Sequence, residues 1–253
     1  MSDLAAQAQT LRDLHRTGEP LVLANAWDAA TAKNVEAAGF PAVATTSAGV
    51  ALALGYEDHQ HTPPDEMFAA VARIAAAVDV PVTADLEGGY GLGATELVER
   101  MLDAGVAGLN FEDTDHAAGG ESMIEPNAQA TRIAELRQAA RAAGVDIVIN
   151  ARTDAYVRGI TDPFDASLER GRLYLGSGAD CVFPIAVREE REIARFATDF
   201  AAVNVLFVPG VPDLAQLAQL GVARISMGGG LAHVSFAAHK QLLERLRSGQ
   251  SYW

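Results

Sequence analysis

The stretch Pro81–Asp113, PVTADLEGGYGLGATELVERMLDAGVAGLNFED, contains the structural unit that decides the fold of this chain. It begins with a short, largely apolar run, passes through a glycine-rich turn into a helical pattern, and ends in a second apolar run. Runs that are apolar almost throughout are typical of strands buried on both faces, as in a parallel sheet covered by helices. The stretch therefore predicts a β-α-β unit with parallel strands.

The same unit recurs along the whole chain of 253 residues. Alanine-rich helical patterns separate the apolar runs, and several start with Asp or Thr at a capping position and end in Gly. Eight such units in about 250 residues predict a single α/β domain over residues 1–253, a TIM-type (β/α)8 barrel. A doubly wound open sheet is the alternative. The apolar runs begin at Leu21, Ala42, Pro81, Gly108, Asp146, Cys181, Ala202 and Arg224.

Composition excludes several classes of partner. The formal net charge is −14, and no basic stripe exists that could replace the counterions of a nucleic acid, so we expect no nucleic-acid partner. No apolar run approaches the roughly 20 residues of a membrane helix, and the N-terminal segment lacks the apolar core of a signal peptide. We therefore expect a cytoplasmic protein that does not bind membranes.

Acidic residues end two of the predicted strands. In a barrel, side chains at the carboxyl ends of the strands converge on one mouth. Asp85 and Glu87 end the third run and, being two residues apart, share one face of an extended chain, while Glu112 ends the fourth run. Two carboxylates about 5 Å apart repel by roughly 3 kcal/mol at an effective dielectric constant of about 20, so the cluster needs a counter-charge.

Oxygen ligands without neighbouring His or Cys favour a hard cation. We therefore expect Asp85, Glu87 and Glu112 to form a Mg²⁺ site. The alternative is that these acids cap helices or pair with arginines. The segment GYGLGA (residues 89–94) also fits a dinucleotide-binding fingerprint, but the two acids before it would repel a pyrophosphate, so this interpretation is disfavoured.

Four segments together carry a resemblance to a known family. They are TTSAGVALALGYED (residues 45–58), TADLEGGYG (residues 83–91), NFEDT (residues 110–114) and INARTDAY (residues 149–156). From about Leu21 to Ala232 the chain resembles the isocitrate lyase/phosphoenolpyruvate mutase superfamily. The resemblance implies a Mg²⁺-dependent barrel, with Mn²⁺ as an alternative ion, that makes or breaks a C–C or P–C bond beside a 2-oxo acid through an enolate held by the metal.

The resemblance also implies the metal ligands. Asp85 corresponds to the main metal acid of the family. Glu87, Glu112 and Asp58 correspond to acids that reach the ion through water. This set agrees with the acids selected above from strand position alone, except for Asp58, which the resemblance adds.

Substrate contacts are implied by the same resemblance. Thr46, Ser47 and Ala48 correspond to the segment that holds the substrate carboxylate, and Arg152 to the arginine that reaches the enolate or carboxylate oxygens. A metal ion and a guanidinium together stabilise negative charge on a 2-oxo oxygen, so the chemistry agrees. A structural pairing of Arg152 with Asp154 or Glu112 is the alternative and is compatible with this role.

Three further residues are candidates for the site. Asn204 lies in the seventh run, and Trp27 follows the first run, where it either walls the pocket or packs in the core. His116 lies in the loop after the fourth strand, titrates near neutral pH in its free form, and is our candidate catalytic acid or base. A solvated loop histidine is the alternative for His116.

Differences between this chain and the family motifs reduce the number of reactions that we expect it to catalyse. The lyases of the family carry a Lys-Lys-Cys-Gly-His segment in the loop after the fourth strand, whereas this chain has TDHAAGGESMIEP (residues 114–126), without Cys or Lys. Enzymes of phosphonopyruvate place a lysine in that loop, but residues 114–129 contain no Lys or Arg. We therefore expect an enzyme that cleaves a C–C bond of a small 2-oxo or 2-hydroxy (di)carboxylic acid, as a lyase or hydrolase. The alternative is an impaired barrel that binds or senses a 2-oxo acid.

The C-terminal segment, residues 231–253, has the pattern of an amphipathic helix followed by a tail. In the resembled family the last helix packs on a neighbouring barrel. The resemblance therefore implies a dimerisation helix exchanged between subunits of a homodimer or homotetramer.

Overall fold

The strands of the structure, a computed structural model that describes residues 4–251 and 253, coincide with the eight predicted runs. Ala24 divides the first run into two short strands, so the described residues contain nine strands. Every strand pairing is parallel, as the continuous apolar runs predicted. The strands are β1 (Leu21–Leu23), β2 (Asn25–Ala26), β3 (Val43–Thr45), β4 (Val82–Asp85), β5 (Gly108–Glu112), β6 (Val148–Thr153), β7 (Cys181–Pro184), β8 (Asn204–Leu206) and β9 (Arg224–Ser226).

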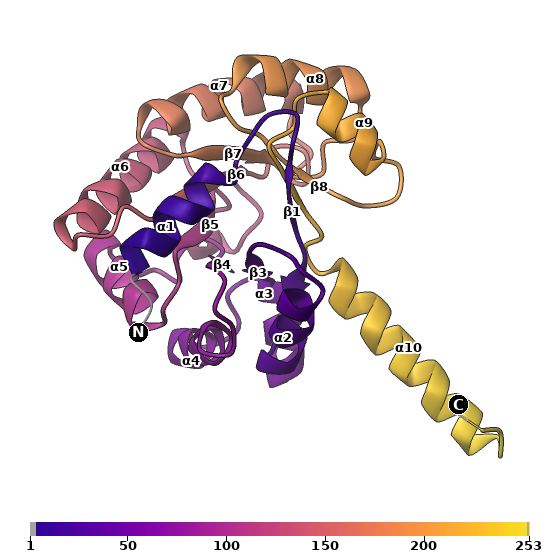
Figure 1. Cartoon of the computed structure of the whole chain (residues 1–253). Coiled ribbons are helices and arrows are strands. Elements are labelled where there is room, and N and C mark those ends of the chain that lie inside the picture. Colours follow the sequence, from indigo (N-terminus) through magenta and orange to yellow (C-terminus); the bar gives the residue numbers. More distant parts are fainter. Residues whose placement is uncertain (1–3, 252) are drawn as a thin grey trace.

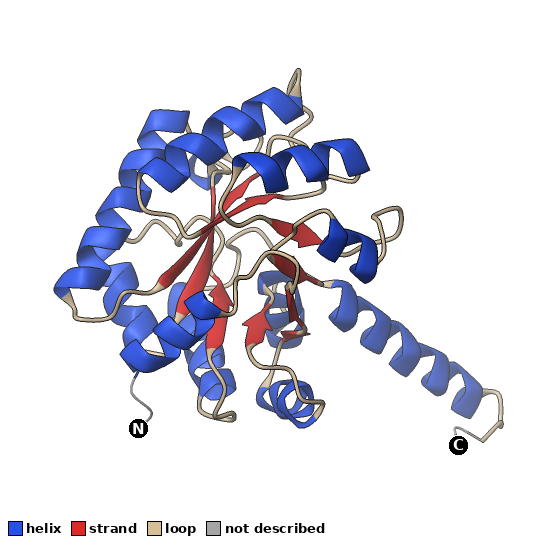
Figure 2. Cartoon of the chain, turned by 45° about the horizontal axis from the view of Figure 1, so that its top comes forward, coloured by secondary structure: helices blue, strands red, loops and turns tan. Residues whose placement is uncertain are grey.

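Two hydrogen-bonded sheets form the barrel. One has the strand order β1-β9-β8, and the other runs from β2 to β7 in sequence order. The chain passes directly from β1 to β2, and a parallel bridge between Val182 and Val203 links β7 to the segment that leads into β8. Strands therefore lie at the centre with helices around them (Figure 2), which confirms the predicted TIM-type barrel.

Helices follow the strands and bury one face on the sheet. In α5, the buried side chains Leu97, Val98 and Met101 recur at helical spacing. Glu96 lies in the first turn, where its negative charge interacts favourably with the helix dipole. Asp28 caps α2 in a capping box with Thr31. The helices are α1 (Leu4–Asp13), α2 (Ala29–Ala37), α3 (Ser47–Leu54), α4 (Pro64–Ala75), α5 (Ala94–Asp103), the short 3₁₀ helix η1 (His116–Ala118), α6 (Pro126–Ala142), α7 (Pro163–Gly176), α8 (Glu190–Asp199), α9 (Leu214–Gln219) and α10 (Gly230–Arg247).

Helix α1 packs at the end of the barrel where the strands begin. Its buried residues Ala8 and Leu11 form a cluster with Leu21 and Leu23 of β1 and with Val148, the first residue of β6. Each fully buried aliphatic side chain of this kind contributes about 1.5–3 kcal/mol. Because α1 covers the amino-terminal ends of the strands, a site open to substrate has to lie at their carboxyl ends.

Helix α10 extends away from the barrel (Figure 1). Ala232 in its first turn is buried, whereas the described apolar residues farther along are largely exposed. Val234 is 69% exposed, Leu243 51% and Leu246 48%. Within the described part of the chain, neither α10 nor any other helix has both the length and the apolar content needed to cross a membrane.

Candidate active site

The predicted acids meet at the carboxyl ends of neighbouring strands. Asp85 is the last residue of β4 and Glu112 the last of β5, and Glu87 follows in the loop after β4. Their exposed fractions are only 9%, 2% and 3%, respectively. Glu112 is the register partner of Arg152 on β6, and the Arg152 Nη1 atom lies 2.7 Å from Glu112 Oε2. The structure thus brings together three acids and one arginine from adjacent strands.

Asp85 is held by the turn between β3 and α3. The backbone N–H and the hydroxyl of Ser47 donate to Asp85 Oδ2 at 3.2 and 3.1 Å, and the Asp85 N–H donates to Thr45 Oγ1 at 2.9 Å. Asp85 Oδ1 is buried and has no hydrogen-bond partner among the described residues. Burial raises the pKa of Asp85, although the charge of Arg152 opposes this shift. The free oxygen is therefore the one available to a cation.

The turn that holds Asp85 also contains the predicted carboxylate-binding segment. Thr46 is the N-cap of α3, and its hydroxyl accepts from the Gly49 N–H at 3.4 Å. Ser47 and Ala48 form the first turn of α3, with Ser47 buried and Ala48 half-buried. These three residues therefore lie beside Asp85 at the mouth of the barrel.

Glycines after β4 allow the loop to fold back over the acids. Gly89 has a φ of +86°, and a Cβ atom at Gly88 would lie 2.8 Å from Gln60 Nε2 and 3.0 Å from His116 Cδ2. A side chain at Gly88 would thus require the side chains of Gln60 and His116 to shift. Glu87 itself adopts a left-handed conformation with φ of 50°, which costs free energy for a residue with a side chain. The glycine-rich run therefore serves close approach of loops, and not pyrophosphate binding.

Glu87 lies in an environment that disfavours its charge. Burial and the nearby charges of Glu112, Asp58 and Asp85 raise its pKa to about 9. The Tyr90 hydroxyl donates to Glu87 Oε1 at 2.8 Å and fixes its carboxyl group. Sequence reasoning missed Tyr90, although its place three residues after Glu87 in a tight loop allows exactly this kind of local contact.

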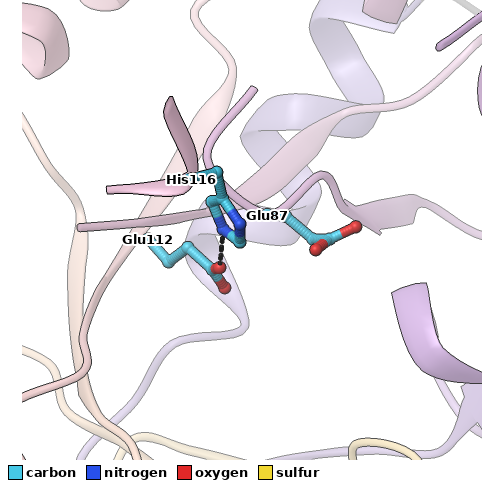
Figure 3. Close-up of side chains that lie close together, drawn as sticks. All are labelled: Glu87, Glu112 and His116. Carbon is cyan, nitrogen blue, oxygen red and sulfur yellow. Dashed lines mark hydrogen bonds and ion pairs between the residues drawn. The ribbon is translucent and has the colours of Figure 1, made fainter. Parts of the chain in front are cut away.

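His116 belongs to the acid cluster. Its Nε2 atom donates to Glu112 Oε1 at 2.6 Å, and the side chain is only 12% exposed (Figure 3). Single ligand atoms of Glu87, Glu112 and His116 all lie within 4.8 Å of one another. His116 is therefore not a solvated loop histidine, so that alternative is wrong. The expectation that the acids have no histidine nearby is also wrong. The loop after β5 folds back through η1, which places the histidine over the strand that precedes it.

Asp58 lies in the loop after α3. Its Oδ1 atom is buried without a hydrogen-bond partner, and its charge contributes to the raised pKa values of Glu87 and Asp85. The His61 Nδ1 atom donates to the Asp58 carbonyl oxygen at 2.7 Å, which shapes this loop. The structure therefore places Asp58 near the other acids.

Arg152 bridges two carboxylates. Besides its contact with Glu112, its Nε atom donates to Asp154 Oδ1 at 2.6 Å. Burial opposes the charge of Arg152, but Glu112 and Asp154 outweigh it and raise the pKa of the guanidinium. Thr114 donates its hydroxyl hydrogen to Asp154 Oδ2. The pairing that the sequence left as an alternative is confirmed, and it holds the arginine in the mouth.

A second set of side chains, not singled out in the sequence, supports the loop after β5. Asp113 Oδ2 accepts hydrogen bonds from Arg170 Nη1 at 2.9 Å and from the Tyr174 hydroxyl at 2.6 Å. Arg170 also donates to the Ile124 carbonyl oxygen at 2.9 Å. Burial raises the pKa of Asp113 to about 6, although Arg170 opposes the shift. These contacts from α7 anchor both ends of the loop that carries His116.

Two further predicted residues, Asn204 and Trp27, pack against other parts of the chain. Asn204 is the first residue of β8, is fully buried, and donates from Nδ2 to Ser226 Oγ at 3.2 Å inside the barrel. The structure therefore does not place Asn204 at the carboxyl end of its strand. Trp27 packs against Phe236 of α10 with ring centroids 5.9 Å apart, which favours the packing alternative over a pocket wall.

Comparison with known proteins places the chain in a family. The family described as phosphoenolpyruvate phosphomutase matches residues 11–247. An uncharacterized protein of Mycobacterium tuberculosis is 33% identical over 87% of this chain and 81% of its own length. The 2-methylisocitrate lyase of Escherichia coli is 30% identical over 87% of this chain and 73% of the lyase.

A solved structure agrees with this assignment. The structure of oxaloacetate acetylhydrolase with its product oxalate superimposes with a TM-score of 0.86 at 25% identity, covering 96% of this chain and 87% of that one. That structure and this chain therefore share the same fold. The chain belongs to the phosphoenolpyruvate phosphomutase family, within the isocitrate lyase/phosphoenolpyruvate mutase superfamily that its motifs resemble.

Proposed function

We propose that this chain is a Mg²⁺-dependent lyase or hydrolase that cleaves a C–C bond of a small 2-oxo or 2-hydroxy (di)carboxylic acid. The chain is an enzyme of its superfamily, and similar members are named as 2-methylisocitrate lyases and an oxaloacetate acetylhydrolase. The observation that carries the proposal is the buried mouth in which Arg152 lies against Glu112, beside an Asp85 oxygen that has no partner.

The acids fit a divalent cation. Among the described residues, Asp85 and Asp58 each have a buried oxygen without a partner, and burial together with repulsion from the other acids raises the pKa of Glu87. Mg²⁺ prefers one or two direct carboxylates and water for its other contacts, so Asp85 is our direct ligand, with Glu87, Glu112 and Asp58 around it. The nitrogen of His116 makes Mn²⁺ a second suitable ion. When bound, such an ion supplies a Lewis acid that polarises a 2-oxo oxygen.

Arg152 supplies the fixed positive charge. Its guanidinium stays protonated because Glu112 and Asp154 hold it, so it can stabilise negative charge that grows on a substrate oxygen without reorganising. The amides at the start of α3, at Thr46, Ser47 and Ala48, suit the substrate carboxylate because the N-terminus of a helix attracts anions.

His116 is the proposed proton donor or acceptor. Residues 114–129 contain no Cys or Lys, so the imidazole of His116 is the group that we assign to proton transfer in this segment. Its hydrogen bond to Glu112 orients the ring toward the acids. Proton transfer to the departing carbanion requires such a group within hydrogen-bond reach.

A binding protein for a 2-oxo acid is the second candidate. The observation that favours it is the missing Cys and Lys of the loop, because without a proton donor the site would bind a 2-oxo acid without cleaving it. Both candidates use the same acids and the same arginine, so turnover separates them.

Proton NMR of the purified protein with Mg²⁺ tests the proposal directly. Samples contain oxaloacetate, 2-oxoglutarate, isocitrate, methylisocitrate, alkylmalates or phosphonopyruvate, each with an EDTA control. Loss of one compound that is faster than its spontaneous decay and sensitive to EDTA is the expected result, and the products identify the broken bond. Line broadening of a 2-oxo acid without turnover would support the binding protein instead.

Two variants test the assigned roles. Asp85→Ala should abolish both turnover and Mg²⁺-dependent binding, and if it left both unchanged the metal site would be wrongly assigned. His116→Ala should lower the rate at least about tenfold with little change in substrate affinity, as loss of a general acid does. An unchanged rate in His116→Ala would remove this residue from the mechanism.

We infer further that α10 packs on a neighbouring copy in a homodimer or homotetramer. Leu231, Val234, Leu243 and Leu246 on α10 are exposed although they are apolar, and the helix extends away from its own barrel (Figure 1). Exposed apolar surface of this kind is typical of an interaction site. A dimerisation role for residues 231–253 therefore remains our proposal.

A further inference from the structure

Two adjoining hollows open beside the acid cluster, with volumes of about 310 and 490 Å³. They share His59, His61 and His116, and His116 also contacts Glu112 of the acid cluster. We call the combined space the side hollow. His116 thus belongs both to the side hollow and to the acid cluster. The proposed function gives no role to the other residues that line the side hollow. Further lining residues are Gln60, Tyr90 and Arg158.

Strained backbone surrounds the side hollow. His59 and Gln60 are consecutive residues with φ of 69° and 63°, and Tyr90 has a φ of 56°. Left-handed conformations are unfavourable for residues with a side chain, and they persist where the surrounding structure enforces them, often at ligand sites. Two loops, after α3 and after β4, therefore hold strained residues around this space at a cost in stability.

Arg158 contributes a guanidinium without an acidic partner. Its Nε atom donates to Thr114 Oγ1 at 3.3 Å, and no carboxylate of the described residues lies within salt-bridge distance of it. Arg152 and Arg170, by contrast, are each paired with buried carboxylates. Arg158 is half-buried and lines the side hollow, so its charge is available to an anion there.

Arg158 is connected to the reacting end of the site. Thr114 accepts from Arg158 and donates to Asp154, and Asp154 accepts from Arg152. Two side chains thus separate the two guanidiniums. Thr114 and Asp154 thus link the guanidinium of Arg158 to that of Arg152, where the 2-oxo group is proposed to bind.

The positive charge available in the side hollow matches a single negative charge on a ligand. Arg132 also lines it, but its guanidinium donates to the Gly88 carbonyl oxygen at 2.6 Å and to Gln129 Oε1 at 2.8 Å. Asp115 and Glu121 bring negative charge to the same walls. A carboxylate, with one charge, matches Arg158, whereas a doubly charged phosphonate would be poorly compensated.

We propose that Arg158 binds the distal carboxylate of the substrate and selects a dicarboxylic acid over both a monocarboxylic acid and a phosphonate of the same length. The inference rests on the proposed function, since it presumes that the 2-oxo acid binds at Asp85 and Arg152. It adds a specificity residue in the loop after β6 and distinguishes this chain from an enzyme of phosphonates.

Matched ligands test the proposal. One set is 2-oxobutanoate, oxaloacetate and phosphonopyruvate, which differ only in a terminal methyl, carboxylate or phosphonate group. The longer set is 2-oxopentanoate, 2-oxoglutarate and 2-oxo-4-phosphonobutanoate. Dissociation constants are measured by calorimetry with freshly dissolved acids and Mg²⁺ or EDTA, and NMR of each sample afterwards reports any turnover.

We expect the carboxylate-ended acid of at least one set to bind at least tenfold more tightly than its methyl-ended and phosphonate-ended partners. Arg158→Gln should weaken its binding on the order of tenfold to a hundredfold, the loss expected for a charge-assisted hydrogen bond, and leave the methyl-ended acid unchanged. Arg158→Lys should restore part of the loss. The control is Arg191→Gln, which removes the same charge from an exposed arginine of α8. It should leave the dissociation constants of all the acids unchanged.

The outcomes separate this inference from the proposed function. Mg²⁺-dependent binding of the acids without a preference for the carboxylate end, or with equal losses for all acids in Arg158→Gln, would overturn the inference and leave the function standing. Preference for a phosphonate would also overturn it. Absence of Mg²⁺-dependent binding of any acid would refute the proposed function, and the inference with it.

Discussion

Glu87→Gln should make the metal-free protein more stable and at the same time weaken the proposed metal site. Glu87 is 3% exposed, and its pKa is raised from 4.5 to about 9, by burial first and then by the charges of Glu112, Asp58 and Asp85. At pH 7 this carboxyl group is protonated in the folded chain but ionised in the unfolded chain. The difference of 2.5 pH units between pH 7 and the unfolded pKa corresponds to about 3 kcal/mol of lost stability.

The sign of the effect follows from linkage. The folded pKa lies above the unfolded one, so the full stability is present below about pH 4.5 and decreases as pH rises toward about 9. Coulomb repulsion gives a similar size, because two charges 4.8 Å apart, the limit for the ligand atoms of Glu87 and Glu112, repel by about 3 kcal/mol at a dielectric constant of about 20. Glutamine removes the charge and retains an oxygen for the hydrogen bond from Tyr90.

Urea unfolding monitored by circular dichroism measures this effect. In EDTA at pH 7, Glu87→Gln should raise the free energy of unfolding by about 3 kcal/mol and flatten its decrease with pH. Mg²⁺ at a hundred times its dissociation constant should stabilise the wild type by about 2.7 kcal/mol, and the variant by less. Glu169→Gln, an exposed glutamate of α7, is the control and should change neither value. A variant that is no more stable than the wild type in EDTA would refute the repulsive cluster, and an undiminished Mg²⁺ effect would remove Glu87 from the metal site.

Two further predictions concern distant parts of the chain. Burial and the charge of Arg224 lower the pKa of His15 from 6.5 to about 4, so its contribution to stability is present above pH 6.5 and is lost as pH falls toward 4. Between pH 7 and pH 5 the wild type should therefore lose about 2 kcal/mol more than His15→Gln in urea unfolding, and equal slopes would show that His15 is not held neutral. On α10, the double variant Val234→Asp, Leu243→Asp changes exposed side chains and should dissociate the proposed homodimer or homotetramer without unfolding the barrel. Light scattering after size exclusion checks this, and an unchanged mass would place the interface elsewhere.

The barrel was predictable because the sequence patterns that specify its strands and helices are local. Each strand is a short apolar run, each helix carries its own caps and buried spacing, and repetition of the unit leaves few ways to assemble them. The acids were predictable for a related reason. Asp85 and Glu112 end strands of a parallel barrel, and all carboxyl ends of such strands point to one mouth.

Other residues could not be placed in this way because their positions depend on loops. His116 was a candidate, but its contact with Glu112 exists only because the loop after β5 folds back and is anchored by Asp113 and Arg170 from α7. Asn204 was a candidate because it lies in the seventh run, yet strand pairing starts at this residue, which puts it inside the barrel. Where a strand begins is decided by its neighbours, which lie far away in the sequence.

The sequence by itself determined the α/β barrel, the family, and the acids and arginine at the ends of strands. These follow from local patterns and from motif residues at adjacent positions. Three features depend on the tertiary structure: Glu112 and Arg152 are register partners, His116 joins the acids, and Arg158 lines a hollow without an acidic partner among the described residues. The physical reason is that those contacts join separate strands and loops, and their geometry is set by packing of the whole barrel.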